Sequence, residues 1–301
     1  MSTRNTSPRS IRLGAVVPQT ELPPDAGAAR HWFAQVEQLR FDHALIYDHV
    51  LGADTSVRPG WSGAYEATDP FLEVMVALAW AAGFTERLEL ATGVVILPQR
   101  QTALVAKQAA TIDHLSGGRL RLGVGIGWNK VEYDALNEQF NNRGKRLEEQ
   151  IALMRRLWTE PVVTFEGEWH HVDHAGILPL PVQRPIPVWI GASADVAIRR
   201  AARLADGFYP QGVPSEKMEH MLAVLFEALE RHERDRETFG IEARITVSTD
   251  DEAEWRRQAA WWREKGITHL SLNTMRGGLT SIEAHLEAFS RGREALLQEI
   301  G

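Results

Sequence analysis

Two adjacent polar residues, Asp48 and His49, directly follow the apolar run HALIY and have the chemistry for proton transfer. An imidazole exchanges its proton near neutral pH, so His49 could act as a general acid or base. If the apolar run is a strand of a parallel sheet, both side chains lie at its carboxyl end, where such folds bind ligands. The alternative is structural, with the pair capping the long segment that follows.

A second candidate is the stretch RLRLGVGIGWNK, residues 119–130, in which glycines alternate with apolar residues. Because strand side chains alternate between two faces, Gly123, Gly125 and Gly127 share one face with Arg121, and the large apolar residues share the other. The glycine face would clear space for a ligand. A dinucleotide-binding fingerprint needs a different spacing, G-x-G-x-x-G opening directly into a helix. Close packing between strands is the alternative use of these glycines.

Two further stretches combine glycine with the end of a strand. Gly93, in ATGVVILPQRQ, predicts a bulge or a close approach of the backbone to a ligand, although an uninterrupted buried strand also fits. Gly191, Ala192 and Ser193 lead from the strand VWI into a helix. The N–H groups at such a helix start suit a phosphate, but Ser193 could instead be a helix cap without a ligand.

The segment WHHVDH contains residue types that bind metals. Adjacent histidines point to opposite faces of a strand, so the segment favours a surface hairpin turning at Glu166-Gly167, and we expect no metal site there. Its potential ligands are His170, His171, Asp173 and His174. The chain has no cysteine, which excludes disulfides, thiolate nucleophiles and cysteine-bound metals.

Eight apolar runs alternate with amphipathic ones, as in a parallel sheet whose strands are connected by helices. The runs begin at Ile11, His43, Leu88, Leu120, Pro187, Gly207, Arg244 and Thr268. This order predicts an α/β fold, a (β/α)8 TIM barrel, with a doubly wound open sheet as the alternative. Asp69-Pro70 predicts the start of a helix that stops at Gly83, and residues 102–115 predict the next helix.

We expect one domain over residues 1–301, with residues 1–10 as a flexible N-terminus and residues 159–186 as an insertion before the fifth strand. The net charge of -7 is spread along the chain, which favours a small-molecule substrate over nucleic acid as the partner. The sequence shows no secretion signal and no apolar run of membrane-spanning length. We therefore expect a cytoplasmic protein without a membrane partner.

Taken in order, these stretches make the chain similar to the luciferase-like monooxygenase superfamily, and especially to its coenzyme F-420-dependent branch. The resemblance runs from Leu13 to about Pro210 and continues more weakly to the C-terminus. It rests on the segments GAVVPQ, YDHVL, DPFLEVMVALAWAAGFTERLELATGVVILPQRQTALVAKQAATIDHLSGGRLRLGVGIGWNKVEYDALN, RGKRLEEQIALMRRLW and LPLPVQRPIPVWIGASADVAIRRAARLADGFYP. Their order and spacing together are specific, although no single one is.

The resemblance implies a barrel that holds a deazaflavin at the carboxyl ends of its strands, with FMN as the alternative cofactor. Asp48 and His49 would lie beside the reactive ring as the catalytic pair. A cis peptide bond between Gly93 and Val94 would form a bulge behind the ring. The other expected cofactor contacts are Gly125, Gly127, Trp128, Asn129 and the phosphate loop of Gly191, Ala192 and Ser193.

One position departs from the pattern of the family. Some F-420-dependent relatives have a glutamate near the place of Trp128, so a protonating role there does not transfer to this chain. Trp128 or Asn129 is expected to shape the substrate side instead, with Glu132 available one turn further on.

The function implied by the resemblance is hydride transfer between coenzyme F-420 and a small organic substrate. An FMN-dependent monooxygenase using reduced flavin and oxygen, a flavin-binding protein without turnover, and a metal-dependent hydrolase are the alternatives. Relatives commonly pair through barrel helices, so a homodimer formed through VMVALAW or through AAWW near Trp261 is expected.

Overall fold

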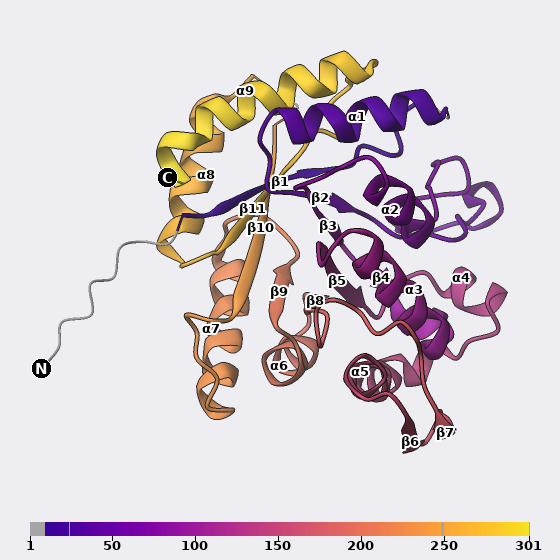
Figure 1. Cartoon of the computed structure of the whole chain (residues 1–301). Coiled ribbons are helices and arrows are strands. Elements are labelled where there is room, and N and C mark those ends of the chain that lie inside the picture. Colours follow the sequence, from indigo (N-terminus) through magenta and orange to yellow (C-terminus); the bar gives the residue numbers. More distant parts are fainter. Residues whose placement is uncertain (1–9, 24, 248–249, 301) are drawn as a thin grey trace, which may run out of the picture.

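The computed structural model describes residues 10–23, 25–247 and 250–300, so nearly all of the N-terminal segment expected to be flexible lies outside the described residues. Eight parallel strands form a barrel, and the third is divided into two short pieces, β3 and β4 (Figure 1). The strands are β1 (Arg12–Val16), β2 (His43–Ile46), β3 (Glu89–Thr92), β4 (Val95–Ile96), β5 (Leu120–Gly125), β8 (Val188–Ala192), β9 (Gly207–Pro210), β10 (Gly240–Thr246) and β11 (His269–Asn273).

The barrel is closed, which confirms the predicted fold and shows that the open-sheet alternative is wrong. Strand β3 pairs with β2 along one edge and with β5 along the other, where Leu90 lies opposite Leu120. The pairing of β1 with β11 joins the first barrel strand to the last. Each of the eight strand positions, with β3 and β4 counted as one, therefore has two neighbours, and all carboxyl ends meet at one mouth.

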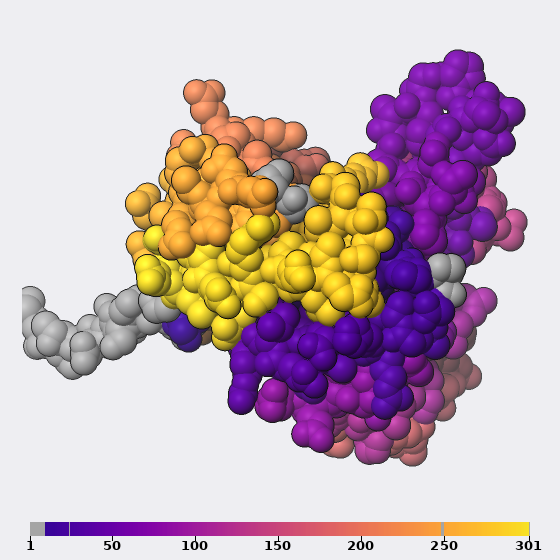
Figure 2. All heavy atoms as spheres, turned by 90° about the horizontal axis from the view of Figure 1, so that it is seen from above, coloured from indigo at the N-terminus to yellow at the C-terminus, as the bar shows by residue number. Residues whose placement is uncertain are grey.

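Helices surround the barrel and bury its apolar outer face (Figure 1). At the ends of the chain, α9 and α1 lie side by side, and Trp32 of α1 packs against Phe289 of α9 (Figures 1 and 2). The helices are α1 (Ala26–Gln38), α2 (Val74–Ala82), α3 (Thr102–Leu115), α4 (Lys130–Ala135), α5 (Arg143–Thr159), α6 (Asp195–Leu204), α7 (Glu216–Arg231), α8 (Glu252–Glu264) and α9 (Ile282–Ile300). No helix within the described ranges is long and apolar enough to cross a membrane.

The predicted helix ends are partly confirmed. Helix α3 has the predicted bounds, and α2 stops at Gly83 as expected. The predicted start of α2 at Asp69-Pro70 is wrong, because the helix begins at Val74 and the Glu73 carboxylate accepts the Val76 N–H. The Asp69 carboxylate instead accepts the Glu66 N–H within the preceding loop.

The insertion before the fifth barrel strand contains the predicted hairpin, formed by β6 (Val163–Glu166) and β7 (His171–Ala175). Glu149 of α5 holds its turn, accepting the N–H groups of Glu168, Trp169 and His170. His171 and His174 are exposed. Within the described part of the chain, no group of three or more histidine or acidic side chains could hold a metal ion. The hairpin therefore serves as a surface element fixed to α5.

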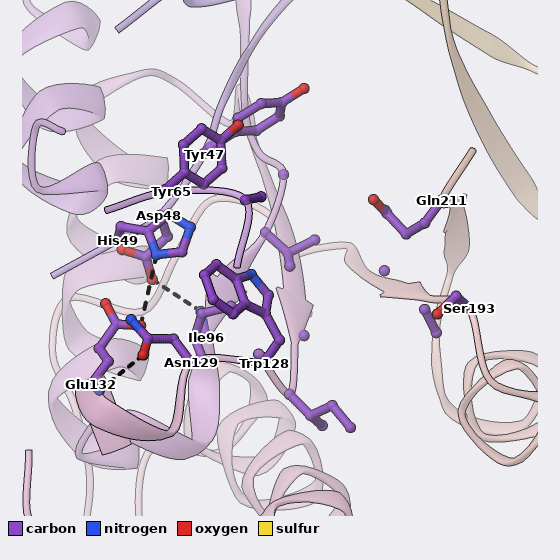
Figure 3. A pocket seen from close by; sticks show the side chains of 18 of the residues that line it. Tyr47, Asp48, His49, Tyr65, Ile96, Trp128, Asn129, Glu132, Ser193 and Gln211 are labelled. Atoms are coloured by element: carbon purple, nitrogen blue, oxygen red, sulfur yellow. Dashed lines mark hydrogen bonds and ion pairs between the residues drawn. The ribbon is translucent and has the colours of Figure 1, made fainter. Parts of the chain in front are cut away.

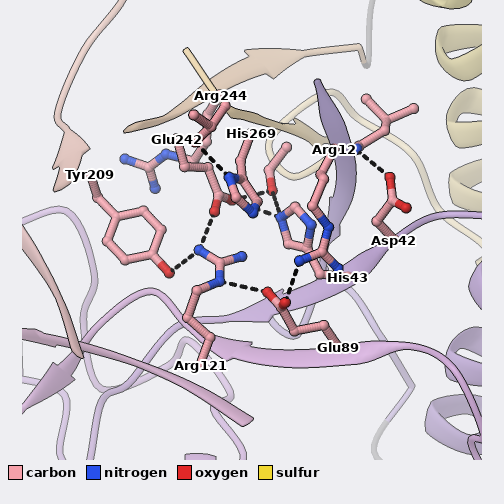
Figure 4. A network of polar contacts seen from close by, with 12 residues as sticks. Arg12, Asp42, His43, Glu89, Arg121, Tyr209, Glu242, Arg244 and His269 are labelled. Atoms are coloured by element: carbon pink, nitrogen blue, oxygen red, sulfur yellow. Dashed lines mark hydrogen bonds and ion pairs between the residues drawn. The ribbon is translucent and has the colours of Figure 1, made fainter. Parts of the chain in front are cut away.

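A buried ionic network fills the lower barrel interior (Figure 4). Arg121 of β5 points inward, as the strand alternation predicts, and donates to Glu89, to Glu242 and to the Tyr209 hydroxyl at 2.5 to 2.7 Å. Burial acts to raise the pKa of Glu89, but Arg121, His43 and Arg12 outweigh it and lower the pKa to about 2. These ion pairs close the barrel below the mouth.

Candidate active site

The mouth of the barrel contains a cavity of about 610 Å³. This is the position at which barrels of this type bind ligands. The eleven residues singled out as site residues in the sequence all line it: Asp48, His49, Gly93, Val94, Gly125, Gly127, Trp128, Asn129, Gly191, Ala192 and Ser193. Figure 3 shows His49 and Trp128 on one side of the open space and Ser193 on the other. Residues far apart in the chain are thus brought to one cavity.

The wall of the cavity is interrupted where β3 ends and β4 begins. The Gly93–Val94 peptide bond is cis, as the resemblance implied. A Cβ atom on Gly125 would lie 2.6 Å from Cγ2 of Val94, and one on Gly191 would lie 3.0 Å from its Cγ1. The Val94 side chain therefore lies between two glycine positions, and together they make a smooth wall free of bulky groups.

The carboxylate of Asp48 stabilises this wall of the cavity. Its carboxylate is buried, accepts the Ile96 N–H at 3.0 Å and forms an ion pair with Arg100 at 2.7 Å. Burial raises the pKa of Asp48, and the Arg100 guanidinium opposes that shift. Arg100 also pairs with Glu73, at 2.6 Å. Because both of its oxygens have protein partners, the carboxylate joins the end of β2 to β4.

His49 faces aromatic rings on one side and a carboxylate on the other. Its ring lies 5.0 Å from the Tyr65 ring and 5.7 Å from the Trp128 ring, measured between centroids. Its Nδ1 lies 3.8 Å from Oε2 of Glu132 (Figure 3). An imidazole held in this way presents its other nitrogen in a defined direction, as general acids and bases require.

Glu132 is a buried carboxylate whose partners keep it ionised. It accepts the N–H groups of Val50 and Leu51 at 2.6 and 3.1 Å, and Nε2 of Gln99 at 3.1 Å. Burial acts to raise its pKa, but the nearby His49 imidazole and the hydrogen bonds from the Leu51 and Val50 N–H groups outweigh burial and lower it. The charge therefore stays beside His49 across the neutral pH range.

Asn129 fixes the start of α4 and so positions Glu132 beside His49. Its side-chain oxygen accepts the N–H groups of Val131 and Glu132 and so starts α4 directly after the glycine strand. Asn129 is buried and its amide is occupied by backbone groups, whereas the Trp128 side chain is 41% exposed and free to contact a ligand.

Of the phosphate loop predicted at Gly191, Ala192 and Ser193, the first two are the last residues of β8, and Ser193 lies between β8 and α6. The N-cap residue of α6 is Ala194, which has no side chain to cap the helix, so the alternative role of Ser193 as that cap is wrong. The Ser193 side chain is exposed in the cavity mouth. Arg143, at the start of α5, lines the same cavity and stacks over Phe140 at 3.7 Å.

Several cavity residues were not anticipated, because they come from loops or from strand positions without a glycine signal. Tyr65 belongs to the long segment after β2, and Arg276 follows β11 with a φ of 65°. The Arg276 guanidinium donates to the Ala64 carbonyl and lies 4.8 Å from the Tyr65 ring. The other unanticipated polar residues are Arg143, Gln211, Arg244 and Asn273. Tyr47, directly before Asp48 at the end of the same apolar run, also lines the cavity.

Comparison with known families gives a match over nearly the whole chain. The family model described as luciferase-like monooxygenase matches residues 10–299. The uncharacterized protein Rv0940c of Mycobacterium tuberculosis is 39% identical over 154 residues, which is 51% of this chain and 53% of that protein. The match therefore spans about half the length of this relative.

Two further comparisons involve F-420-dependent proteins. An F-420-dependent glucose-6-phosphate dehydrogenase of Intrasporangium calvum is 35% identical over 224 residues, covering 72% of this chain and 64% of the relative. A solved F-420-dependent secondary alcohol dehydrogenase, in complex with an F-420-acetone adduct, superposes with a TM-score of 0.72 over 95% of this chain and 99% of that one. At 16% identity, the second comparison shows a shared fold.

Proposed function

Because the chain belongs to the luciferase-like monooxygenase family, we propose that it is an oxidoreductase that uses coenzyme F-420 and transfers hydride between the deazaflavin and a small organic substrate. The observation that carries the proposal is the arrangement of the cavity, in which a glycine-walled space lies between the His49–Glu132 pair and the start of α6. The 35% identity to an F-420-dependent dehydrogenase favours F-420 as the cofactor.

The cavity fits a flat ring with an attached phosphate. The wall at Val94, Gly125 and Gly191 has no polar or bulky side chain that would oppose a ring. The uncapped start of α6, preceded by the exposed Ser193 hydroxyl, offers hydrogen-bond donors to a phosphate. Arg143 adds a positive charge to the lining of the same cavity. These residues would hold the cofactor, which supplies two-electron hydride transfer when bound.

Residues of the protein carry out the proton transfer that accompanies hydride transfer. His49 is the group that gives a proton to the substrate oxygen, or removes it in the reverse direction. The ionised Glu132 carboxylate, 3.8 Å from Nδ1, stabilises the protonated imidazole and orients the ring. Asp48 has a positioning role rather than a direct one, since its carboxylate holds β4 through Ile96. The rings of Tyr65 and Trp128 flank the imidazole, with centroids 5.0 and 5.7 Å away.

The test is a titration of the purified chain with coenzyme F-420 and with FMN under the same conditions, followed by fluorescence. We expect tighter binding of F-420, and weaker binding when Arg143 is replaced by Met. Arg231→Met, at an exposed site of α7, serves as the control. Tight binding of FMN alone, with oxygen consumption by the reduced form, would favour the monooxygenase alternative. Cofactor binding without turnover of any substrate would favour a binding protein.

We also propose a homodimer that forms through α2. This helix exposes Val76 and Trp80, and Leu72 is exposed just before it. The other segment considered, AAWW, is less suitable because Trp262 is fully buried. Sedimentation equilibrium should give twice the chain mass for the wild type and a single chain mass for Val76→Asp. A wild-type monomer at micromolar concentration would contradict the proposal.

A further inference from the structure

The charged groups inside the barrel are paired with one exception. Arg121 is neutralised by Glu89 and Glu242, and Arg12 also pairs with Glu89. Arg244 lies on β10 two residues beyond Glu242, one step nearer the mouth (Figure 4). None of the acidic side chains in the described ranges forms an ion pair with it. Its Nη1 donates to the Tyr47 hydroxyl at 2.8 Å and its Nη2 to Oε1 of Gln211 at 2.6 Å, and both acceptors are neutral.

Arg244 lines the cavity, and no carboxylate there is available to it. The two acidic residues of the lining, Asp48 and Glu132, are occupied by Arg100, by backbone N–H groups and by Gln99. A guanidinium has five N–H donors, and the protein uses two of those on Arg244. Arg244 is partly buried at the cavity wall, and its two hydrogen-bond acceptors are neutral. A ligand that supplies an anion would therefore form an ion pair that the protein itself does not provide.

Tyr47 and Gln211 fix the direction of the guanidinium. They come from opposite parts of the barrel, at the ends of β2 and β9, and hold one nitrogen each. The Arg244 guanidinium also lies 5.4 Å from the centre of the Tyr47 ring. A guanidinium whose two terminal nitrogens are both held by hydrogen bonds has a fixed orientation. It is therefore preorganised for a planar anion with two oxygens, which an arginine binds with two parallel hydrogen bonds.

We propose that the organic substrate of this site carries a carboxylate on a planar or aromatic body, with the carboxylate bound by Arg244. The inference rests on the proposed function and names its substrate class. Aromatic side chains beside the guanidinium indicate the planar body. Tyr47 and Tyr65 line the cavity between Arg244 and the pair formed by His49 and Trp128, and such rings favour contact with a flat ligand. A substrate of this shape would have one end on Arg244 and its reacting carbon near His49.

The experiment compares two probes of nearly the same shape, benzoate and its neutral analogue benzamide, by calorimetric titration. Each is titrated into the full chain, with and without saturating F-420. We expect the wild type to bind benzoate at least about tenfold more tightly than benzamide, since a hydrogen-bonded ion pair is stronger than a neutral hydrogen bond. Tenfold corresponds to about 1.4 kcal/mol. Arg244→Met should remove this preference, and Arg244→Lys should restore part of it. Arg231→Met is the matched control and should keep it.

Three outcomes would overturn the inference. The first is equal binding of benzoate and benzamide to the wild type. The second is a preference for benzoate that survives in Arg244→Met. The third is a loss of F-420 affinity in Arg244→Met with benzoate binding unchanged, which would assign the guanidinium to the cofactor. Failure of the proposed function gives a different result, in which F-420 does not bind to the wild type but the cofactor-free protein still prefers benzoate. Thermal unfolding of each variant checks that it is folded.

Discussion

Nδ1 of His49 lies 3.8 Å from Oε2 of Glu132, and the two residues come from different barrel units. His49 follows β2, whereas Glu132 stands in the first turn of α4, after β5. The Glu132 carboxylate also accepts the N–H groups of Val50 and Leu51, the two residues after the histidine. One side chain thus fixes both the imidazole and the backbone that carries it.

Replacement of Glu132 by Gln should lower kcat at least about tenfold, because the imidazolium loses its counter-charge. Affinity for F-420 should change little, because the glycine wall and the start of α6 are not altered. The measurement is steady-state kinetics at pH 7.5, with a fluorescence titration of F-420 alongside. Asp134→Asn, at an exposed site of the same helix, is the control. An unchanged kcat in Glu132→Gln would count against the pair.

Replacement of Asp48 by Asn should destabilise the fold by about 3 kcal/mol, since it leaves Arg100 largely buried with one carboxylate fewer. Glu73→Gln removes the more exposed partner of the same arginine and should cost no more than about 1 kcal/mol. Urea unfolding measures both variants. Loss of activity in Asp48→Asn with unchanged stability would instead assign the carboxylate a direct role in catalysis.

The glycines of β5 should differ in what they tolerate. A Cβ atom at Gly123 would lie 1.9 Å from the Thr92 carbonyl oxygen, so Gly123→Ala must move the backbone of β3 and should destabilise the fold by about 1 to 3 kcal/mol. At Gly125 the nearest atom is the end of the Val94 side chain. Gly125→Ala should therefore fold, but bind the cofactor about tenfold more weakly, equivalent to 1.4 kcal/mol. Chemical unfolding and fluorescence titration separate the two effects.

Stability should fall in mild acid because of His269. Burial, with Arg121 and His43 nearby, lowers the pKa of His269 to about 3. The unfolded chain takes up a proton near the ordinary value of about 6.5, so stability from this group is present above pH 6.5 and is lost as the pH falls toward 3. At pH 5 the loss is about 2 kcal/mol.

Guanidinium unfolding at pH 7.5 and pH 5 tests this pH dependence. His269→Gln should reduce the difference in unfolding free energy between the two pH values by about 2 kcal/mol. The control is His31→Gln, because His31 is exposed on α1 and should not alter the difference. An equal difference in wild type and His269→Gln would show that other groups cause the acid sensitivity.

The barrel could be predicted from the sequence because its strands are short apolar runs, and these do not depend on distant partners. The exception is β10, which begins at Gly240, four residues before the predicted start at Arg244. The beginning of this strand is not recognisable in the sequence because it contains Glu242, and a charged residue is not expected on the inward face of a barrel strand. It is buried there because Arg121, 121 residues earlier in the chain, neutralises it. No local pattern contains that information.

Some residues of the candidate site could likewise be predicted from the sequence, and others could not. His49, the glycines of β5 and the Gly191–Ser193 loop lie at strand ends, where a barrel must present them, and so they could be found from spacing. Tyr65 and Arg276 could not, because their place at the mouth depends on a contact between two loops more than 200 residues apart in the chain. Arg244 was read as an ordinary strand residue, because its missing partner is visible only when the barrel interior is built.

The series of contacts from Glu73 through Arg100 and Asp48 to Ile96 has a practical consequence for enzyme engineering. Glu73 is partly exposed at the start of α2, while Ile96 belongs to the cavity wall. Directed evolution that randomises only the cavity lining would therefore leave out a position able to reshape it from outside. A mutant library for altered substrate range should include Glu73 and Arg100, where small changes can shift β4 without placing a new side chain against the ligand.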